Sequence, residues 1–156
     1  MVAGLTQAEV RYVVIGGVAA TAHGSRRVTD DLDICYDPAL GNRARLAALI
    51  ARWHAYPRGV EPGLPFIMDA VTLDRAPLLT LTTDEGDLDC VDEVSGVGRY
   101  GAVAAASAAV TVGDVRFHVL GLSALIKAKR ASGRPKDREA LLELEALFEL
   151  QRRPAR

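Results

Sequence analysis

The segment that most constrains the fold is residues 31–36 (DLDICY), where polar and apolar side chains alternate. This period of two predicts a β-strand with Leu32 and Ile34 on one face and Asp31 and Asp33 on the other. Two carboxylates this close repel each other, which costs stability unless a cation or a proton relieves the repulsion. A solvated acidic face is the commoner explanation for one such pair alone.

Other strands and helices follow without regular alternation. Strands are predicted at 11–15, 78–83, 87–92, 108–112 and 115–120, the last four as two hairpins. Helices are predicted over 18–23, from Asp37 to Trp53 with Asp37 as N-cap and Pro38 first, from Asp69, and over 99–107, 122–132 and 135–149. This order favours an α+β (mixed α/β) fold, a small mixed or antiparallel sheet flanked by helices, with two C-terminal helices.

Composition limits the classes of function. The 156 residues suit one domain (1–156, core 11–149). No apolar run is long enough to span a membrane, so no membrane is expected among the partners. The formal charge of −1 argues against binding polyanions by bulk charge, but residues 30–37 and 84–93 are acidic and residues 126–138 are basic. Cys35 and Cys90 lack metal-site spacing, which favours a cytoplasmic protein with reduced thiols.

Four further features bear on chemistry. Gly16-Gly17 ends the first predicted strand, and such a pair is either a tight turn or an approach for phosphate oxygens. Asp87-Leu88-Asp89 could add a third carboxylate to Asp31 and Asp33, a ligand set suited to divalent metals. Lys129 and Asp137 fall on the apolar stripes of the last two helices, where snorkelling and the helix dipole are the simpler explanations.

Together these residues resemble a known superfamily. The first motif of the nucleotidyltransferase superfamily, with its DNA-polymerase-β-like fold, resembles Gly16-Gly17 … Arg27-x-Thr29-x-Asp31-Leu32-Asp33-Ile34. The AbiEii/MenT group, toxin enzymes of type IV toxin–antitoxin systems, has a tail similar to Lys127-Ala-Lys129-Arg130 … Gly133-Arg134-Pro135-Lys136-Asp137. The similarity spans roughly residues 11–149. Two departures are that Gly24-Ser25 lies only five residues before Asp31, and that the chain is shorter than several toxins of the group.

The resemblance implies a role for each matching position. Asp31 and Asp33 would ligate Mg²⁺ or Mn²⁺, and Asp89 would be the third carboxylate and the base for the attacking hydroxyl, with Asp87 as the alternative on the same strand face. Lys129 would neutralise phosphate charge, and Asp137 would complete the site or orient Lys129. The nucleotide-binding positions would be Gly16 and Gly17 at the triphosphate and Arg27 and Thr29 in the loop that presents the aspartates.

The resemblance also implies an activity. The enzyme would be a magnesium-dependent, toxin-type nucleotidyltransferase that moves a nucleoside monophosphate from an NTP such as ATP onto an RNA end, a tRNA 3′ end first, or onto a protein hydroxyl. Its expected partners are the NTP, the acceptor and a cognate antitoxin. The alternatives are a non-catalytic, antitoxin-like or regulatory binding module on the same fold and a metal-dependent phosphodiesterase.

Overall fold

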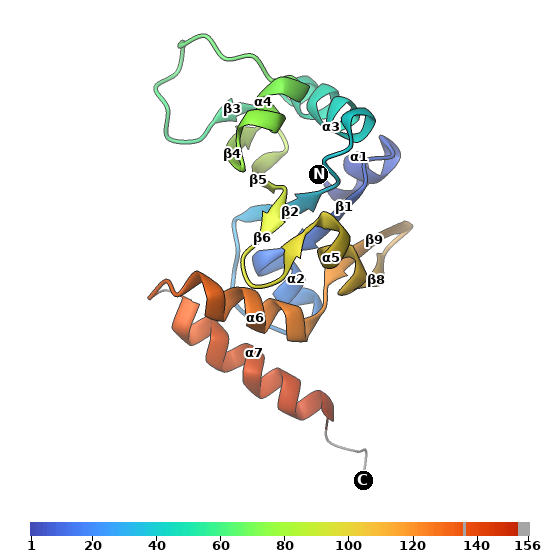
Figure 1. The fold of residues 1–156 in the computed structure, drawn as a ribbon, viewed down its shortest axis with the longest axis vertical. Coiled ribbons are helices and arrows are strands. Elements are labelled where there is room, and N and C mark those ends of the chain that lie inside the picture. Colours follow the sequence, from blue (N-terminus) through green and yellow to red (C-terminus); the bar gives the residue numbers. More distant parts are fainter. Residues whose placement is uncertain (136, 153–156) are drawn as a thin grey trace.

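A seven-stranded mixed sheet forms the centre of the molecule in the computed structural model, which describes residues 1–135 and 137–152 (Figure 1). The strand order is β3-β4-β5-β2-β1-β9-β8. Their bounds are β1 Tyr12–Ile15, β2 Asp31–Tyr36, β3 Tyr56–Pro57, β4 Leu78–Thr83, β5 Gly86–Val91, β8 Ser107–Val112 and β9 Val115–Leu120. β2 pairs with β5 and β1 with β9 in parallel, and the other pairs are antiparallel. A separate hairpin-like pair joins β6 Glu93–Val94 to β7 Gly98–Arg99.

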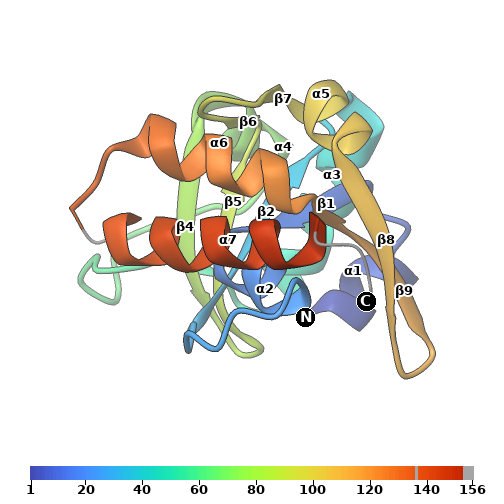
Figure 2. The same ribbon diagram turned by 90° about the horizontal axis from the view of Figure 1, so that it is seen from below.

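Helices lie at both ends of the long axis. Their bounds are α1 Val2–Gln7, α2 Gly16–Ala22, α3 Leu40–Arg52, α4 Ala70–Arg75, α5 Tyr100–Ala105, α6 Leu122–Ser132 and α7 Asp137–Arg152. Figure 1 shows α6 and α7 at one end and α1, α3 and α4 at the other. Seen from below, α6 and α7 run side by side in front of the central strands (Figure 2). None of the described helices combines the length and apolar character needed to cross a bilayer.

The buried face of β2 is the one that its alternation predicts. Leu32 and Ile34 are 4% and 0% exposed, and they belong to a continuous core with Val13 and Val14 of β1. Leu46, Leu49 and Ile50 of α3 pack in the same core. The polar face of β2, with Asp31 and Asp33, is only half-buried, so the core fixes the register of the strand and leaves the carboxylates accessible.

The α+β architecture expected from the sequence is confirmed, with a mixed sheet and two C-terminal helices. The ranges 31–36, 78–83, 115–120 and 122–132 coincide with β2, β4, β9 and α6, and Asp69 is the N-cap of α4. The short elements α1, β3, β6 and β7 were not anticipated. α2 begins at Gly16, two residues earlier than predicted, because Gly16 adopts a φ of +61° that glycine tolerates at a strand-to-helix turn.

The start of α3 is a correction. Its N-cap is Ala39 and not Asp37, and Pro38 precedes the helix. The Asp37 carboxylate accepts from the Ala39 amide (2.9 Å) and pairs with Arg11 (2.7 Å). The buried Asn42 side chain donates to the carbonyls of Asp37 (2.8 Å) and Arg11 (3.0 Å). These bonds hold the strand end extended for two more residues and delay the first helical turn.

Candidate active site

Four aspartates meet on neighbouring strands because β2 and β5 pair in parallel. The register places Asp31 beside Asp87 and Asp33 beside Asp89. One carboxylate oxygen from each of Asp31, Asp33 and Asp89 lies within 4.8 Å of the others. Oxygens at ~2.0–2.6 Å from one divalent ion have separations in this range, so the three side chains can share a cation.

The glycine pair allows α2 to pack directly against this acidic face. A Cβ at Gly16 would overlap the Asp33 carboxylate, and a Cβ at Gly17 would lie 2.6 Å from the Thr29 side chain. The Gly17 backbone also lowers the pKa of the Asp33 carboxylate. Both glycines are therefore needed for close approach to the strand that carries the carboxylates. Their expected role at a triphosphate stays a prediction.

Crowding shifts the acid–base behaviour of the site. Burial, followed by the charges of Asp31 and Asp89, raises the pKa of Asp33 to about 6, against the opposing effect of Lys129 and the Gly17 backbone. Burial also raises the pKa of Asp89, although the Arg58 guanidinium opposes the shift. A divalent ion at these oxygens would offset the repulsion among the carboxylates, which adds to both shifts.

Thr29 and Arg27 belong to the loop before β2. The Thr29 hydroxyl donates to the Asp31 carboxylate (3.0 Å), which orients the first aspartate. Arg27 reaches across to Glu139 of α7 (3.4 Å) and also borders the cavity described below. The Thr29 hydroxyl is thus directed to the first aspartate, whereas the Arg27 guanidinium is directed to a helix carboxylate. The nucleotide-binding role expected of both residues stays a prediction.

Glu143 of α7, which the sequence did not single out, binds the loop before β2 through hydrogen bonds. Glu143 accepts from the Ser25 hydroxyl (3.1 Å) and the Arg26 amide (3.0 Å). Ser25 is buried. No sequence pattern marks Glu143, because it is one of several acidic residues on an amphipathic helix.

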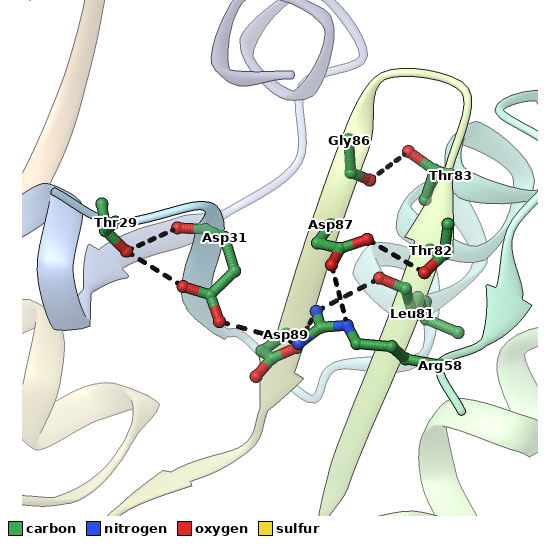
Figure 3. Close-up of polar contacts among 9 residues, drawn as sticks. All are labelled: Thr29, Asp31, Arg58, Leu81, Thr82, Thr83, Gly86, Asp87 and Asp89. Atoms are coloured by element: carbon green, nitrogen blue, oxygen red, sulfur yellow. Dashed lines mark hydrogen bonds and ion pairs between the residues drawn. The ribbon is translucent and has the colours of Figure 1, made fainter. Parts of the chain in front are cut away.

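Arg58 is the second residue that the sequence did not single out, and it contacts three of the aspartates (Figure 3). Its guanidinium lies 2.6 Å from Asp89 Oδ1, 3.1 Å from Asp87 Oδ2 and 3.6 Å from Asp31 Oδ2. The only available signal was that Arg58 is the single Lys or Arg of the Pro- and Gly-rich segment 54–65.

Asp87 and Asp89 are distinguished by their surroundings. Asp89 borders the cavity and belongs to the three-carboxylate group. Asp87 accepts from the Thr82 hydroxyl (2.9 Å) and pairs with Arg58 Nε, and it lies outside that group. The geometry thus favours Asp89 of the two alternatives.

Lys129 and Asp137 form an ion pair between α6 and α7. The Lys129 Nζ lies 2.7 Å from Asp137 Oδ1, and Asp137 also accepts from Ser132 (2.7 Å) and Arg134 (2.7 Å). Burial alone would raise the pKa of Asp137, but the hydrogen bonds from Lys129, Ser132 and Arg134 outweigh it and hold the pKa well below its usual range. Lys136, also part of the quoted tail, lies outside the described residues.

A cavity of about 750 Å³ joins these parts. It is bordered by Asp31, Asp33 and Asp89, by Gly16 and Gly17, and by Arg58 and Lys129. Its size lies within the range of small-molecule and cofactor sites, ~300–1,000 Å³. Acidic ligands for a cation and basic groups for an anion thus border the same space.

Comparison with known proteins bears on the fold. The sequence matches no protein-family model and no curated protein. Among solved structures, it is similar to a protein from Thermotoga maritima described as a putative nucleotidyltransferase, with a TM-score of 0.58 and 14% identity. The match covers 93% of this chain and 88% of that chain. A likeness at this identity concerns the fold and leaves the reaction to be argued from the site. The chain therefore has the nucleotidyltransferase fold.

Proposed function

We propose that this chain is a divalent-metal-dependent nucleotidyltransferase, which moves a nucleoside monophosphate from an NTP to an acceptor hydroxyl. The observation that carries the proposal is the group of three carboxylates, Asp31, Asp33 and Asp89, bordering a cavity of about 750 Å³ that Lys129 also borders. Metal ligands and a phosphate-neutralising cation in one space are what this reaction requires.

The three carboxylates fit a hard cation such as Mg²⁺, with Mn²⁺ as a close substitute. All the donors are carboxylate oxygens, and burial together with the charges of Asp31 and Asp89 raises the pKa of Asp33. The ion would supply charge neutralisation and Lewis-acid activation of the α-phosphate when bound. The chain's own task is to hold the ligands, which Thr29 does for Asp31 through a hydrogen bond and Gly16 does for Asp33 through close packing.

The remaining residues bind the nucleotide and move the proton. Lys129, held by Asp137, would neutralise charge on the departing pyrophosphate. Gly16 and Gly17 would let the triphosphate approach the backbone, with Arg27 at the border of the cavity. The acceptor oxygen would attack the α-phosphorus, the bond to the pyrophosphate oxygen would break, and Asp89 would take the hydroxyl proton. A carboxylate beside the attacking oxygen can accept this proton as a general base.

We further propose an RNA acceptor, a tRNA 3′ end first, with a protein hydroxyl as the second class. This step rests on the resemblance to the toxin enzymes and is supported by the basic side chains on α6, namely Lys127, Lys129 and Arg130. In a toxin–antitoxin pair, a cognate antitoxin would bind the enzyme and suppress it.

The test is incubation with each α-labelled NTP, Mg²⁺ and total RNA, followed by gel separation of RNA and protein. We expect label on RNA with wild type and none with Asp33→Ala, whose unfolding curve serves as the fold control. Undiminished transfer by Asp33→Ala would refute the proposal. Degraded RNA without label would indicate a phosphodiesterase. No label, together with no thermal shift by any NTP with Mg²⁺, would favour a non-catalytic module, because a ligand at 100 times its Kd adds about 2.7 kcal/mol of stability.

A further inference from the structure

Arg58 is fixed by its backbone and lies against the carboxylates through its side chain. Its amide donates to the Thr80 carbonyl (2.9 Å), which extends the β3–β4 pairing by one residue. Tyr56, two residues earlier, packs edge-to-face on Phe66 and donates to the carbonyls of Glu61 and Leu64. The segment that carries Arg58 is therefore held by its own contacts, and the guanidinium can move without the backbone.

The guanidinium occupies oxygens that the proposed metal would need. It lies 2.6 Å from Asp89 Oδ1 and 3.6 Å from Asp31 Oδ2, and both residues belong to the three-carboxylate group. A carboxylate oxygen that accepts a short, charge-assisted hydrogen bond is a poorer metal ligand, and a divalent cation repels a guanidinium at this range. Arg58 and the metal thus compete for the same side of the cluster.

The fit of Arg58 is incomplete. Among the residues that the structure describes, its buried Nε has no partner in hydrogen-bond geometry, although the Asp87 carboxylate lies 3.1 Å away as an ion-pair partner. A buried donor whose contact has poor hydrogen-bond geometry raises the free energy of the arrangement. The side chain is still 31% exposed and borders the cavity, so its guanidinium has room to take another partner there.

We propose that Arg58 is the resident counter-ion of the carboxylate cluster, that the divalent metal displaces it, and that the released guanidinium binds a substrate phosphate in the cavity. The inference rests on the metal site of the proposed function. Arginine suits both states, because its planar fork pairs with carboxylate and phosphate oxygens alike. The phosphate belongs either to the NTP or to a phosphodiester of the acceptor.

The test measures binding and needs no turnover. Mn²⁺ is titrated by electron paramagnetic resonance into wild type, Arg58→Gln, Arg58→Lys and Arg75→Gln. The last variant changes the net charge equally at an exposed position at the end of α4. A non-hydrolysable ATP analogue and a short single-stranded RNA are then titrated separately in saturating Ca²⁺.

We expect Arg58→Gln to bind Mn²⁺ about tenfold more tightly than wild type, the equivalent of one lost charge-assisted contact. Arg58→Lys should lie between the two, and Arg75→Gln should match wild type. A residue that only positioned Asp89 would change metal affinity in the opposite direction. Equal or weaker Mn²⁺ binding by Arg58→Gln, with wild type binding, overturns this inference alone. If neither protein binds Mn²⁺, the metal site of the proposed function fails with it.

The second measurement identifies the phosphate. Arg58→Gln should weaken one of the two ligands by about tenfold. A loss for the ATP analogue assigns the guanidinium to the triphosphate, and a loss for the RNA assigns it to the acceptor. Unchanged affinity for both overturns the exchange. Urea unfolding of Arg58→Gln and Arg58→Lys separates these effects from a loss of fold.

Discussion

Lys129 Nζ lies 2.7 Å from Asp137 Oδ1, and this ion pair links two consecutive helices at the border of the cavity. Asp137 is buried, and Ser132 and Arg134 complete its set of donors. A lysine held in this way keeps its ammonium group in one place, where a flexible side chain would lose rotamer entropy on binding phosphate. The pair therefore connects the stability of the helical hairpin to the charge that the proposed reaction needs.

Asp137→Asn should lower both stability and transfer. The variant leaves Lys129 and Arg134 facing a neutral amide in place of a buried carboxylate, and we expect a loss of about 2 kcal/mol in the free energy of unfolding at neutral pH. Urea unfolding measures it. Glu139→Gln is the matched control, because Glu139 is 82% exposed and its 3.4 Å pair with Arg27 should contribute at most about 0.5 kcal/mol.

The pH dependence of this loss has a definite sign. The pKa of Asp137 is lower in the folded protein than its ordinary value of 3.8. Its contribution is therefore fully present above that value and declines as the pH falls further. The stability difference between wild type and Asp137→Asn should shrink in acid. A difference that stays constant from neutral to acidic pH would show that the charge of Asp137 is not its cause.

Asp33 should make metal binding depend on pH near 6. In the metal-free protein its pKa is raised to about 6 by burial and by Asp31 and Asp89. Protonation competes with the cation, so Mn²⁺ affinity should fall about tenfold for each pH unit below that value and level off above it. Titrations at several pH values measure the effect. A flat profile between about pH 5 and pH 7 would show that Asp33 is not a ligand.

The same shift affects stability with the opposite sign to Asp137. The folded, metal-free protein binds the Asp33 proton more tightly than the unfolded chain does, because the pKa is raised from 3.8 to about 6. This contribution to stability is fully present below pH 3.8 and is lost as the pH rises through about 6. Saturating Mg²⁺ should offset the loss at neutral pH. Thermal unfolding with and without a chelator measures this, and Asp33→Asn should remove the dependence.

The sequence was sufficient for the six longer strands and for the charged residues on them, but not for the short β3, β6 and β7. Alternation in 31–36 predicted both faces of β2, and the apolar stripes of the last helices identified Lys129 and Asp137 as misplaced polar groups. These signals are local, because the spacing of apolar residues within one segment predicts which side chains of that segment are buried. Hairpin turns likewise predicted the antiparallel pairs β4–β5 and β8–β9.

The parallel pairing of β2 with β5 could not be predicted in this way. No turn connects the two strands, and their register of Asp33 beside Asp89 is set by packing across more than fifty residues of sequence. Arg58 was missed because a single arginine in a loop belongs to no repeating pattern, and its contacts with the aspartates depend on the tertiary fold. The start of α3 was misplaced because Asn42, inside the helix, binds the preceding carbonyls.

Asp89→Asn and Asp87→Asn should separate the two candidates for the third carboxylate. The variants make the same change on the same strand face, but only Asp89 borders the cavity with Asp31 and Asp33. We expect Asp89→Asn to lose at least about 100-fold in transfer and to bind Mn²⁺ weakly, and Asp87→Asn to stay within about threefold. Equal losses in the two variants would mean that Asp87 shares the site.

Gly16→Ala should disrupt the site because the added Cβ overlaps the Asp33 carboxylate. Gly133→Ala is the control for backbone strain alone. Gly16 and Gly133 have nearly the same φ, +61° and +60°, so alanine at either position costs about 1 kcal/mol of backbone strain. At Gly133 an added Cβ meets none of the described residues within 4 Å, whereas at Gly16 it overlaps the Asp33 carboxylate. Gly133→Ala should therefore lose only the strain energy and keep its Mn²⁺ affinity.

Gly16→Ala should unfold more easily and bind Mn²⁺ at least about tenfold more weakly, because Asp33 must move away from Asp31 and Asp89. Equal Mn²⁺ affinities in the two variants would show that the close approach of Gly16 does not hold Asp33 in place.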